Sequence, residues 1–244
     1  MIKLLVFIYG LIAYAIFFGT LLYAMGFVGN VVVPKSIDSG AGGLALEALL
    51  INALLLGLFA IQHSGMARRG FKERWTKLIP VPLERSTYVL LSSLSLILLF
   101  WQWRPMTETI WQVENAIGSG ILTAVFWLGW LLVLGSSFMV SHADLFGLRQ
   151  VYLHATGKEY RGVGFKTPMM YKYVRHPLYL GFLAAFWATP RMTQGHLLFS
   201  AATTGYILVA IQFEERDMMH RFGDTYRSYR KRTPMLLPGM KKSR

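Results

Sequence analysis

Residues 171–182 read YKYVRHPLYLGF and residues 211–232 read IQFEERDMMHRFGDTYRSYRKR, with a largely apolar segment between them. If that segment forms a helical hairpin in a membrane, its two ends meet at one surface. Arg175 and His176 would then face Glu214 and Glu215. Ionisable groups held against apolar helices at a bilayer surface commonly mark a functional site. We therefore expect residues 171–232 to hold the functional region.

The composition predicts an all-α, polytopic helical integral membrane protein. Hydrophobic residues make up 54% of the chain and the mean hydropathy is +0.42, which is too apolar for an ordinary soluble domain. Several runs approach the roughly 20 apolar residues that cross a bilayer core. None alternates with period 2 as the strands of a membrane β-barrel do. No soluble segment stands apart, so a single domain over residues 1–244 is expected.

The apolar runs predict five or six transmembrane helices. The spans are expected over residues 4–29, 44–62, 86–103 and 119–140, followed by a C-terminal helical hairpin over residues 178–189 and 195–213. The first arm of the hairpin is short, which leaves the number of full spans open. A signal peptide is the alternative for the first run, but an h-region has only about 7–15 residues. Residues 30–43 read as a loop, and the tail after residue 214 as helical to about 231.

The positive charges predict the orientation. With the N-terminus inside, the inner segments hold 22 of the 25 Lys and Arg residues, and the three outer segments hold Lys35, Arg104 and Arg191, one each. This is the positive-inside pattern. It predicts a multi-pass protein of the cell (inner) membrane with both termini cytosolic, so any chemistry should take place on the cytosolic side and use a cytosolic cofactor. The same pattern explains the net charge of +13, so membrane lipids are expected partners. Neither nucleic acid nor an obligate protein partner is inferred.

Arg175-His176-Pro177 reads as an anion-binding corner. Pro177 suits the first turn of a helix, which puts His176 near the N-cap, where free N–H groups and the helix dipole favour an anion. The guanidinium of Arg175 suits a carboxylate or phosphate. The alternative is an interfacial anchor whose guanidinium reaches lipid headgroups. Glu214 and Glu215 point about 100° apart on a helix, so one can pair within the protein while the other faces a ligand.

A second candidate is His142, which could act as a base with Asp144 as its orienting carboxylate. A helix cap is the alternative role for His142. The chain has no Cys, and no group of residues has convincing metal-ligand spacing, so no metal is predicted. Neither a P-loop nor a dinucleotide-binding glycine fingerprint is present.

Two sets of motifs carry a family resemblance. The C-terminal third resembles the isoprenylcysteine carboxyl methyltransferase and phospholipid methyltransferase-like membrane superfamily. The shared order is Arg175-His176-Pro177-x-Tyr179-x-Gly181, Glu214-Glu215, and Phe222-Gly223-x-x-Tyr226-x-x-Tyr229. Over nearly the whole chain, QHSGMAR (62–68), ERSTY (84–88), FWQWRP (100–105) and SHADLFG (141–147) resemble the bacterial methanethiol S-methyltransferases.

The resemblance implies a thiol S-methyltransferase dependent on S-adenosyl-L-methionine (SAM). It would convert methanethiol, a small volatile thiol, to dimethyl sulfide and S-adenosyl-L-homocysteine. A thiol reacts as its thiolate, so a base is needed, with His142 and His176 as candidates and Tyr171 and Tyr173 to orient the sulfur. Methylation of an isoprenylcysteine carboxylate or a phospholipid amine, or a non-catalytic membrane scaffold, are the alternatives. The residues implied to bind SAM are Arg175, His176, Tyr179, Glu214, Glu215, Tyr226 and Tyr229.

Overall fold

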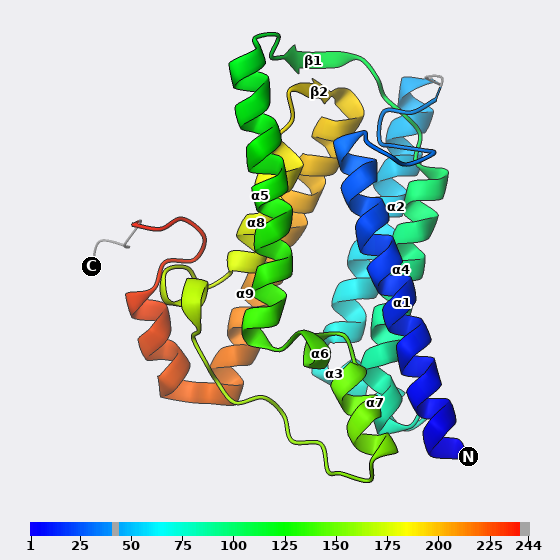
Figure 1. The fold of residues 1–244 in the computed structure, drawn as a ribbon, viewed down its shortest axis with the longest axis vertical. Coiled ribbons are helices and arrows are strands. Elements are labelled where there is room, and N and C mark those ends of the chain that lie inside the picture. Colours follow the sequence, from blue (N-terminus) through cyan, green and yellow to red (C-terminus); the bar gives the residue numbers. More distant parts are fainter. Residues whose placement is uncertain (41–43, 240–244) are drawn as a thin grey trace. The chain divides into compact units, whose positions relative to one another are not determined.

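The computed structural model describes residues 1–40 and 44–239, and it confirms the all-α membrane fold (Figure 1). The predicted loop over 30–43 and the C-terminal tail lie partly outside the described residues. Among these residues, five helical segments are long and apolar enough to cross a membrane, while α8 (Pro177–Trp187) is shorter. The five are α1 (Ile2–Gly29), α2 (Ala45–Ala67), α4 (Glu84–Gln102) with its leading turn η1 (Val81–Leu83), α5 (Ala116–Val140) and α9 (Gln194–Arg232).

The chain divides into two compact units. Unit 1 consists of Met1–Glu108 and Ser141–Val163, and unit 2 consists of Thr109–Val140 and Gly164–Arg244. Each unit is described by itself below. The single domain expected over residues 1–244 stays a prediction.

Unit 1 is a helical bundle in which α1 and α2 both pack on α4 (Figure 1). Near the N-terminal end, α1 also packs on α7 (Leu148–Ala155), where a Cβ on Gly10 would lie 2.5 Å from a methyl group of Val151. At the far end of α1, the ring centroid of Phe27 lies 4.7 Å from that of Phe100. Two short helices, α3 (Arg69–Trp75) and α6 (His142–Leu145), complete the unit.

Unit 2 is built on a close approach of α5 and α8. A Cβ on Gly129 would lie 2.7 Å from the carbonyl oxygen of Gly181, and a Cβ on Gly181 would lie 2.7 Å from the carbonyl oxygen of Gly129. Only glycine therefore permits this contact. The buried ring of Trp130 packs edge-on against Phe182 and Phe186 beside it. This packing fixes the position of α8, whose first residue follows His176.

The predicted hairpin of α8 and α9 is confirmed, and a small strand pair that was not predicted holds its tip. The hydroxyl of Ser200 donates to the carbonyl of Phe186 (2.7 Å), and the indole N–H of Trp187 donates to Thr204 (2.9 Å). At the tip, β2 (Arg191–Thr193) pairs antiparallel with β1 (Thr109–Gln112), which precedes α5 (Figure 1). Strands of three and four residues are too short to give a periodic signal.

The helix α9 runs past the apolar part of the hairpin and then changes direction at Gly223. Its backbone angles there, φ 51° and ψ −126°, are a conformation that glycine adopts without a Cβ penalty. Helix resumes and ends at Arg232, close to the predicted limit of about 231. The kink turns the last helical turns back toward the loop that precedes α8, which contains the short helix η2 (Met169–Lys172) (Figure 1).

Candidate active site

The loop before α8 is held by the residues that follow α9. His176 is the N-cap of α8 and Pro177 its first residue, as predicted. The backbone N–H of Arg175 donates to the carbonyl of Pro234 (2.9 Å), and that of His176 donates to the carbonyl of Met235 (3.2 Å). The return of the chain end to this corner was not predicted.

Glu215 lies at the centre of a closed group of charges. Its Oε1 accepts a hydrogen bond from Nε of Arg175 (2.6 Å) and lies 3.2 Å from Nε2 of His176, and its Oε2 forms an ion pair with Nε of Arg230 (2.9 Å). The side chain of Glu215 is only 3% exposed. We call Arg175, His176, Glu215 and Arg230 the Glu215 cluster. The predicted meeting of 175–176 with 214–215 is confirmed.

Arg230 is the member of the cluster that sequence reasoning missed. In a straight helix, 15 residues span about 22 Å, which would keep Arg230 far from Glu215. The kink at Gly223 brings them into contact. A glycine between two charged stretches of one helix is the signal that would have found this.

The guanidinium of Arg175 is already hydrogen-bonded to other groups of the protein. Besides Glu215, it donates from Nη1 to the carbonyls of Arg230 (3.1 Å) and Thr233, and its side chain is 10% exposed. This geometry gives Arg175 a structural role, because it joins α8, α9 and the residues after α9. Its direct contact with a ligand stays a prediction.

Glu214 has surroundings opposite to those of its neighbour. Its side chain is 41% exposed, and its Oε2 lies 3.9 Å from Nδ1 of His176. The two carboxylates point to different sides of α9, as the helical geometry predicts. Glu214 is thus an accessible carboxylate beside the N-terminus of α8.

The tyrosines predicted for the site fall into two groups. Tyr226 and Tyr229 are buried, and their rings pack around Phe165 with centroids 5.7 and 5.4 Å away. The hydroxyl of Tyr229 donates to the carbonyl of Tyr171 (2.6 Å). These two therefore support the wall of the site, and their predicted contact with SAM stays untested.

The other tyrosines lie nearer to the N-cap corner. The ring of Tyr179 lies 5.7 Å from that of His176, while Tyr173 is 64% exposed. Burial and the nearby carboxylate of Glu214 raise the pKa of Tyr171 well above its ordinary value of 10. Its phenol is therefore neutral at physiological pH and can donate a hydrogen bond without serving as a base.

His142 belongs to unit 1, where it begins α6. Its Nε2 lies 2.8 Å from the hydroxyl of Tyr14, and its ring packs against Phe146 at 4.8 Å. Burial lowers the pKa of His142 below its ordinary 6.5, so the ring is neutral at pH 7 and able to accept a proton. The hydroxyl that orients it comes from α1, a partner 128 positions away that spacing cannot indicate.

Asp144 does not fill the orienting role considered for it. One carboxylate oxygen accepts from Arg149 (3.1 Å) and the other accepts from the hydroxyl of Tyr160 (3.3 Å). His142 and Asp144 are two positions apart on α6, so their side chains point about 200° apart and reach different partners. Tyr14 takes the place that the sequence suggested for Asp144.

A second histidine network in unit 1 was missed. Nε2 of His63 lies 2.8 Å from the hydroxyl of Tyr88, and Nδ1 lies 3.0 Å from the hydroxyl of Ser92. Tyr88 and Ser92 are four residues apart on α4, so polar residues at helical spacing inside an apolar run were the available signal.

Comparison with known proteins places the chain in a family. The family described as NnrU protein matches residues 49–232, three quarters of the chain. The chain belongs to the NnrU protein family. This NnrU-family chain is 57% identical to methanethiol S-methyltransferase 2 of Bradyrhizobium diazoefficiens, over 97% of this chain and 91% of the relative. It is 54% identical to the methanethiol S-methyltransferase of Mycobacterium tuberculosis, over 97% of both chains.

The chain has a more distant likeness to Nurim of Xenopus laevis, to which it is 32% identical over 67% of this chain and 60% of the relative. No solved structure matches the chain. The predicted resemblance to the methanethiol S-methyltransferases is therefore confirmed at high identity and over nearly the full length.

Proposed function

We propose that the chain transfers a methyl group from SAM to methanethiol, giving dimethyl sulfide and S-adenosyl-L-homocysteine. The names of its near full-length relatives support the substrate. The observation that carries the proposal is Glu214, an open carboxylate fixed beside His176 at the start of α8. The N-terminus of α8 can bind the carboxylate of an amino-acid moiety, and Glu214 can bind its ammonium group. The Glu215 cluster holds both in place.

The described residues fit the polar groups of SAM. The N-terminus of α8, through its helix dipole, suits the carboxylate of SAM, and Glu214 suits the ammonium or ribose hydroxyls. The neutral phenol of Tyr171 can donate a hydrogen bond, and the ring of Tyr179 presents an aromatic face of the kind that attracts a cation. When bound, SAM supplies a methyl group on a cationic sulfonium. Glu215 is assigned to the frame, because each of its two oxygens is already paired with an arginine of the protein.

The protein must also remove the proton of the thiol. The sulfur then uses an electron pair to form a bond to the methyl carbon, while the old sulfur–methyl bond breaks and leaves its electron pair on the departing sulfur. We infer that His142 accepts the proton, because its lowered pKa keeps it neutral at pH 7 and Tyr14 holds its ring. His176 remains the alternative base, although its ring nitrogens face Glu214 and Glu215.

The test uses the purified full-length protein in detergent, supplied with methanethiol and SAM carrying a deuterated methyl group. Headspace gas chromatography with mass detection should show deuterated dimethyl sulfide, formed in equal amount with S-adenosyl-L-homocysteine. Calorimetry measures SAM binding separately. SAM binding without dimethyl sulfide would move the proposal to an isoprenylcysteine carboxylate or a phospholipid amine as acceptor. Neither binding nor product would leave a membrane scaffold.

We also propose that both termini face the cytosol across the cell membrane. The pairing of β2 with β1 puts the tip of the hairpin at the N-terminal end of α5, although α8 is short. The helix α9 starts at that tip and runs back, so its far end lies on the side of the membrane where α5 ends. The count of basic residues supports that side as cytosolic. Fluorescent protein fused to the C-terminus should therefore mature, and alkaline phosphatase fused there should be inactive. The reverse result would overturn this orientation.

A further inference from the structure

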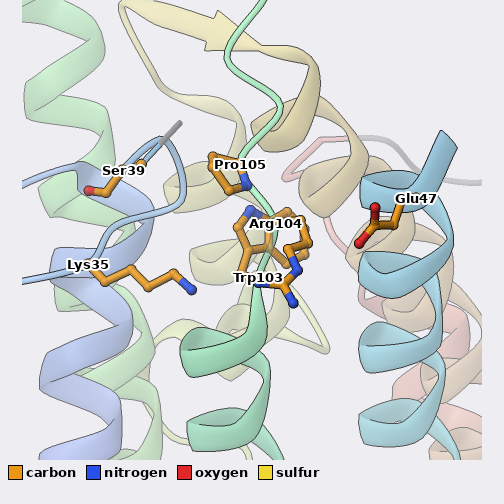
Figure 2. Close-up of a pocket in the computed structure, with 7 residues that line it drawn as sticks. Lys35, Ser39, Glu47, Trp103, Arg104 and Pro105 are labelled. Atoms are coloured by element: carbon orange, nitrogen blue, oxygen red, sulfur yellow. The ribbon is translucent and has the colours of Figure 1, made fainter. Parts of the chain in front are cut away.

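A second polar site lies in unit 1, at the opposite end of α1 from the N-terminus. A pocket of about 390 Å³ opens where α1 ends, α2 begins and α4 ends (Figure 2). Its walls bring together cations from two loops that each hold only one, Lys35 and Arg104, with Glu47 of α2 on the other side. The full lining is Lys35, Ser39, Gly40, Glu47, Trp103, Arg104 and Pro105.

Hydrogen bonds to the backbone fix the position of Arg104. Asn52, fully buried in α2, donates from its side-chain amide to the carbonyl of Arg104 (2.8 Å) and accepts from the N–H of Arg104 (2.9 Å). The indole N–H of the buried Trp103 donates to the carbonyl of Ile37 (3.1 Å), which joins the first loop to the second. These contacts use only the backbone of Arg104, and the residue lines the pocket (Figure 2).

The other cation is held just as firmly. The hydroxyl of Tyr23 donates to the carbonyl of Lys35 (2.9 Å), and the ammonium of Lys35 donates to the carbonyl of Trp101 at the end of α4. The backbone N–H of Ile37 donates to the backbone carbonyl of Phe27 (2.9 Å). The pocket is therefore preorganised, so little ordering free energy is lost when a ligand enters.

The two cations have no ion-pair partner among the residues that the structure describes. Partial burial lowers the pKa of Lys35, and the like charge of Arg104 adds a smaller lowering. Within residues 1–40 and 44–239, neither cation forms an ion pair with Glu47. An anion between Lys35 and Arg104 would remove this repulsion.

We propose that the pocket binds the headgroup of a zwitterionic phospholipid, with its phosphate on Lys35 and Arg104 and its ammonium on Glu47. The place in the fold supports a lipid source for the phosphate, because the pocket lies at the ends of three helices long enough to cross a bilayer. Headgroups lie at that level of a membrane. The mixed signs of the lining match a headgroup that carries one charge of each sign.

Native mass spectrometry of the full-length protein in detergent tests the proposal. The probes are phosphatidylethanolamine, phosphatidylglycerol and inorganic phosphate, each added at the same concentration. Phosphatidylethanolamine should give a discrete one-to-one adduct, and Arg104→Gln should weaken it about tenfold, since a charge-assisted hydrogen bond is lost. Arg191→Gln is the matched control, because it removes the third cation of the sparse loops, whose Nε donates to Thr109 in unit 2 (3.2 Å).

A second variant separates the two ends of the headgroup. Glu47→Gln should weaken the binding of phosphatidylethanolamine and leave the binding of phosphatidylglycerol unchanged, because only phosphatidylethanolamine carries an ammonium group. An unchanged melting temperature shows that the Asn52 contacts persist in each variant. Equal adducts in wild type and Arg104→Gln would overturn the site. Displacement of the lipid by an equal concentration of inorganic phosphate would overturn the lipid as its ligand.

Discussion

The Glu215 cluster and the pocket of Lys35 and Arg104 both gather charges from distant parts of the sequence, yet they treat those charges in opposite ways. In the cluster, the carboxylate of Glu215 is 3% exposed and its oxygens are shared among three partners. In the pocket, Lys35 and Arg104 stand together, and within the described residues the ammonium of Lys35 donates only to a backbone carbonyl, that of Trp101. A closed group stabilises the fold, whereas an open group has interactions left for a ligand. Glu214 belongs to the open class although it adjoins the closed one.

The largest expected effect comes from opening the closed group. Glu215→Ala leaves Arg175 and Arg230 without their carboxylate, and breaking a buried pair costs about 3–5 kcal/mol of the free energy of unfolding. We expect a strongly lowered melting temperature in detergent and no detectable dimethyl sulfide. Glu215→Gln, which keeps the shape, should recover part of the stability. A melting temperature equal to wild type in Glu215→Ala would show that the cluster is not structural.

The next effect concerns the base in unit 1. His142→Gln should reduce turnover by about 10²–10⁴-fold if His142 takes the proton of the thiol. A base must be neutral, and burial lowers the pKa of His142 below its ordinary 6.5, so wild-type activity should be retained as pH falls through 6.5 and lost only at lower pH, where the ring takes up a proton. The pH profile of kcat/KM measures this. His154→Gln is the control, and wild-type turnover in His142→Gln would transfer the role to His176.

A smaller effect is expected from the open carboxylate. Glu214→Gln should raise the KM for SAM by about 10–100-fold, the loss of one charge-assisted hydrogen bond, and leave the melting temperature unchanged. Glu73→Gln is a suitable control because that side chain is 60% exposed and pairs only along its own helix. A lowered melting temperature with an unchanged KM would mean that Glu214 belongs to the frame.

The smallest effect should come from the exposed wall of the cluster. Arg230 is 41% exposed, so its pair with Glu215 is screened by water and contributes about 1 kcal/mol or less. Arg230→Gln should lower the melting temperature slightly and keep most of the turnover. A decrease in melting temperature as large as that expected for Glu215→Ala would show that Arg230 is as essential to the cluster as the buried partners.

Local patterns in the sequence predicted much of this architecture. The apolar runs marked every long helix, and Pro177 marked the start of α8, because these signals depend on a few consecutive residues. The meeting of Arg175 with Glu215 followed from one hairpin. These features need no knowledge of how separate helices pack.

Contacts made across longer distances were not predictable in this way. Arg230 reaches Glu215 only because the backbone turns at Gly223, and Tyr14 reaches His142 only because α1 packs beside α6 and α7. The pocket in unit 1 likewise depends on Asn52, a single polar residue inside an apolar run. In each case a backbone bend or a helix–helix contact decides the partner, and neither leaves a local signal.

The shortness of α8 has a consequence for the two reactants. Its 11 residues rise about 16 Å, roughly half of a hydrocarbon core of about 30 Å. The residues between α8 and α9 supply the remaining length, because Glu214, whose carboxylate lies 3.9 Å from the ring of His176, comes 20 residues after the start of α9, about 30 Å along that helix. The corner formed by His176 and Glu214 therefore lies about a full hydrocarbon thickness from the hairpin tip, at the opposite membrane surface. On the proposed function, this corner would be a boundary between two solvents, where a charged donor arriving from water would meet a thiol dissolved in lipid.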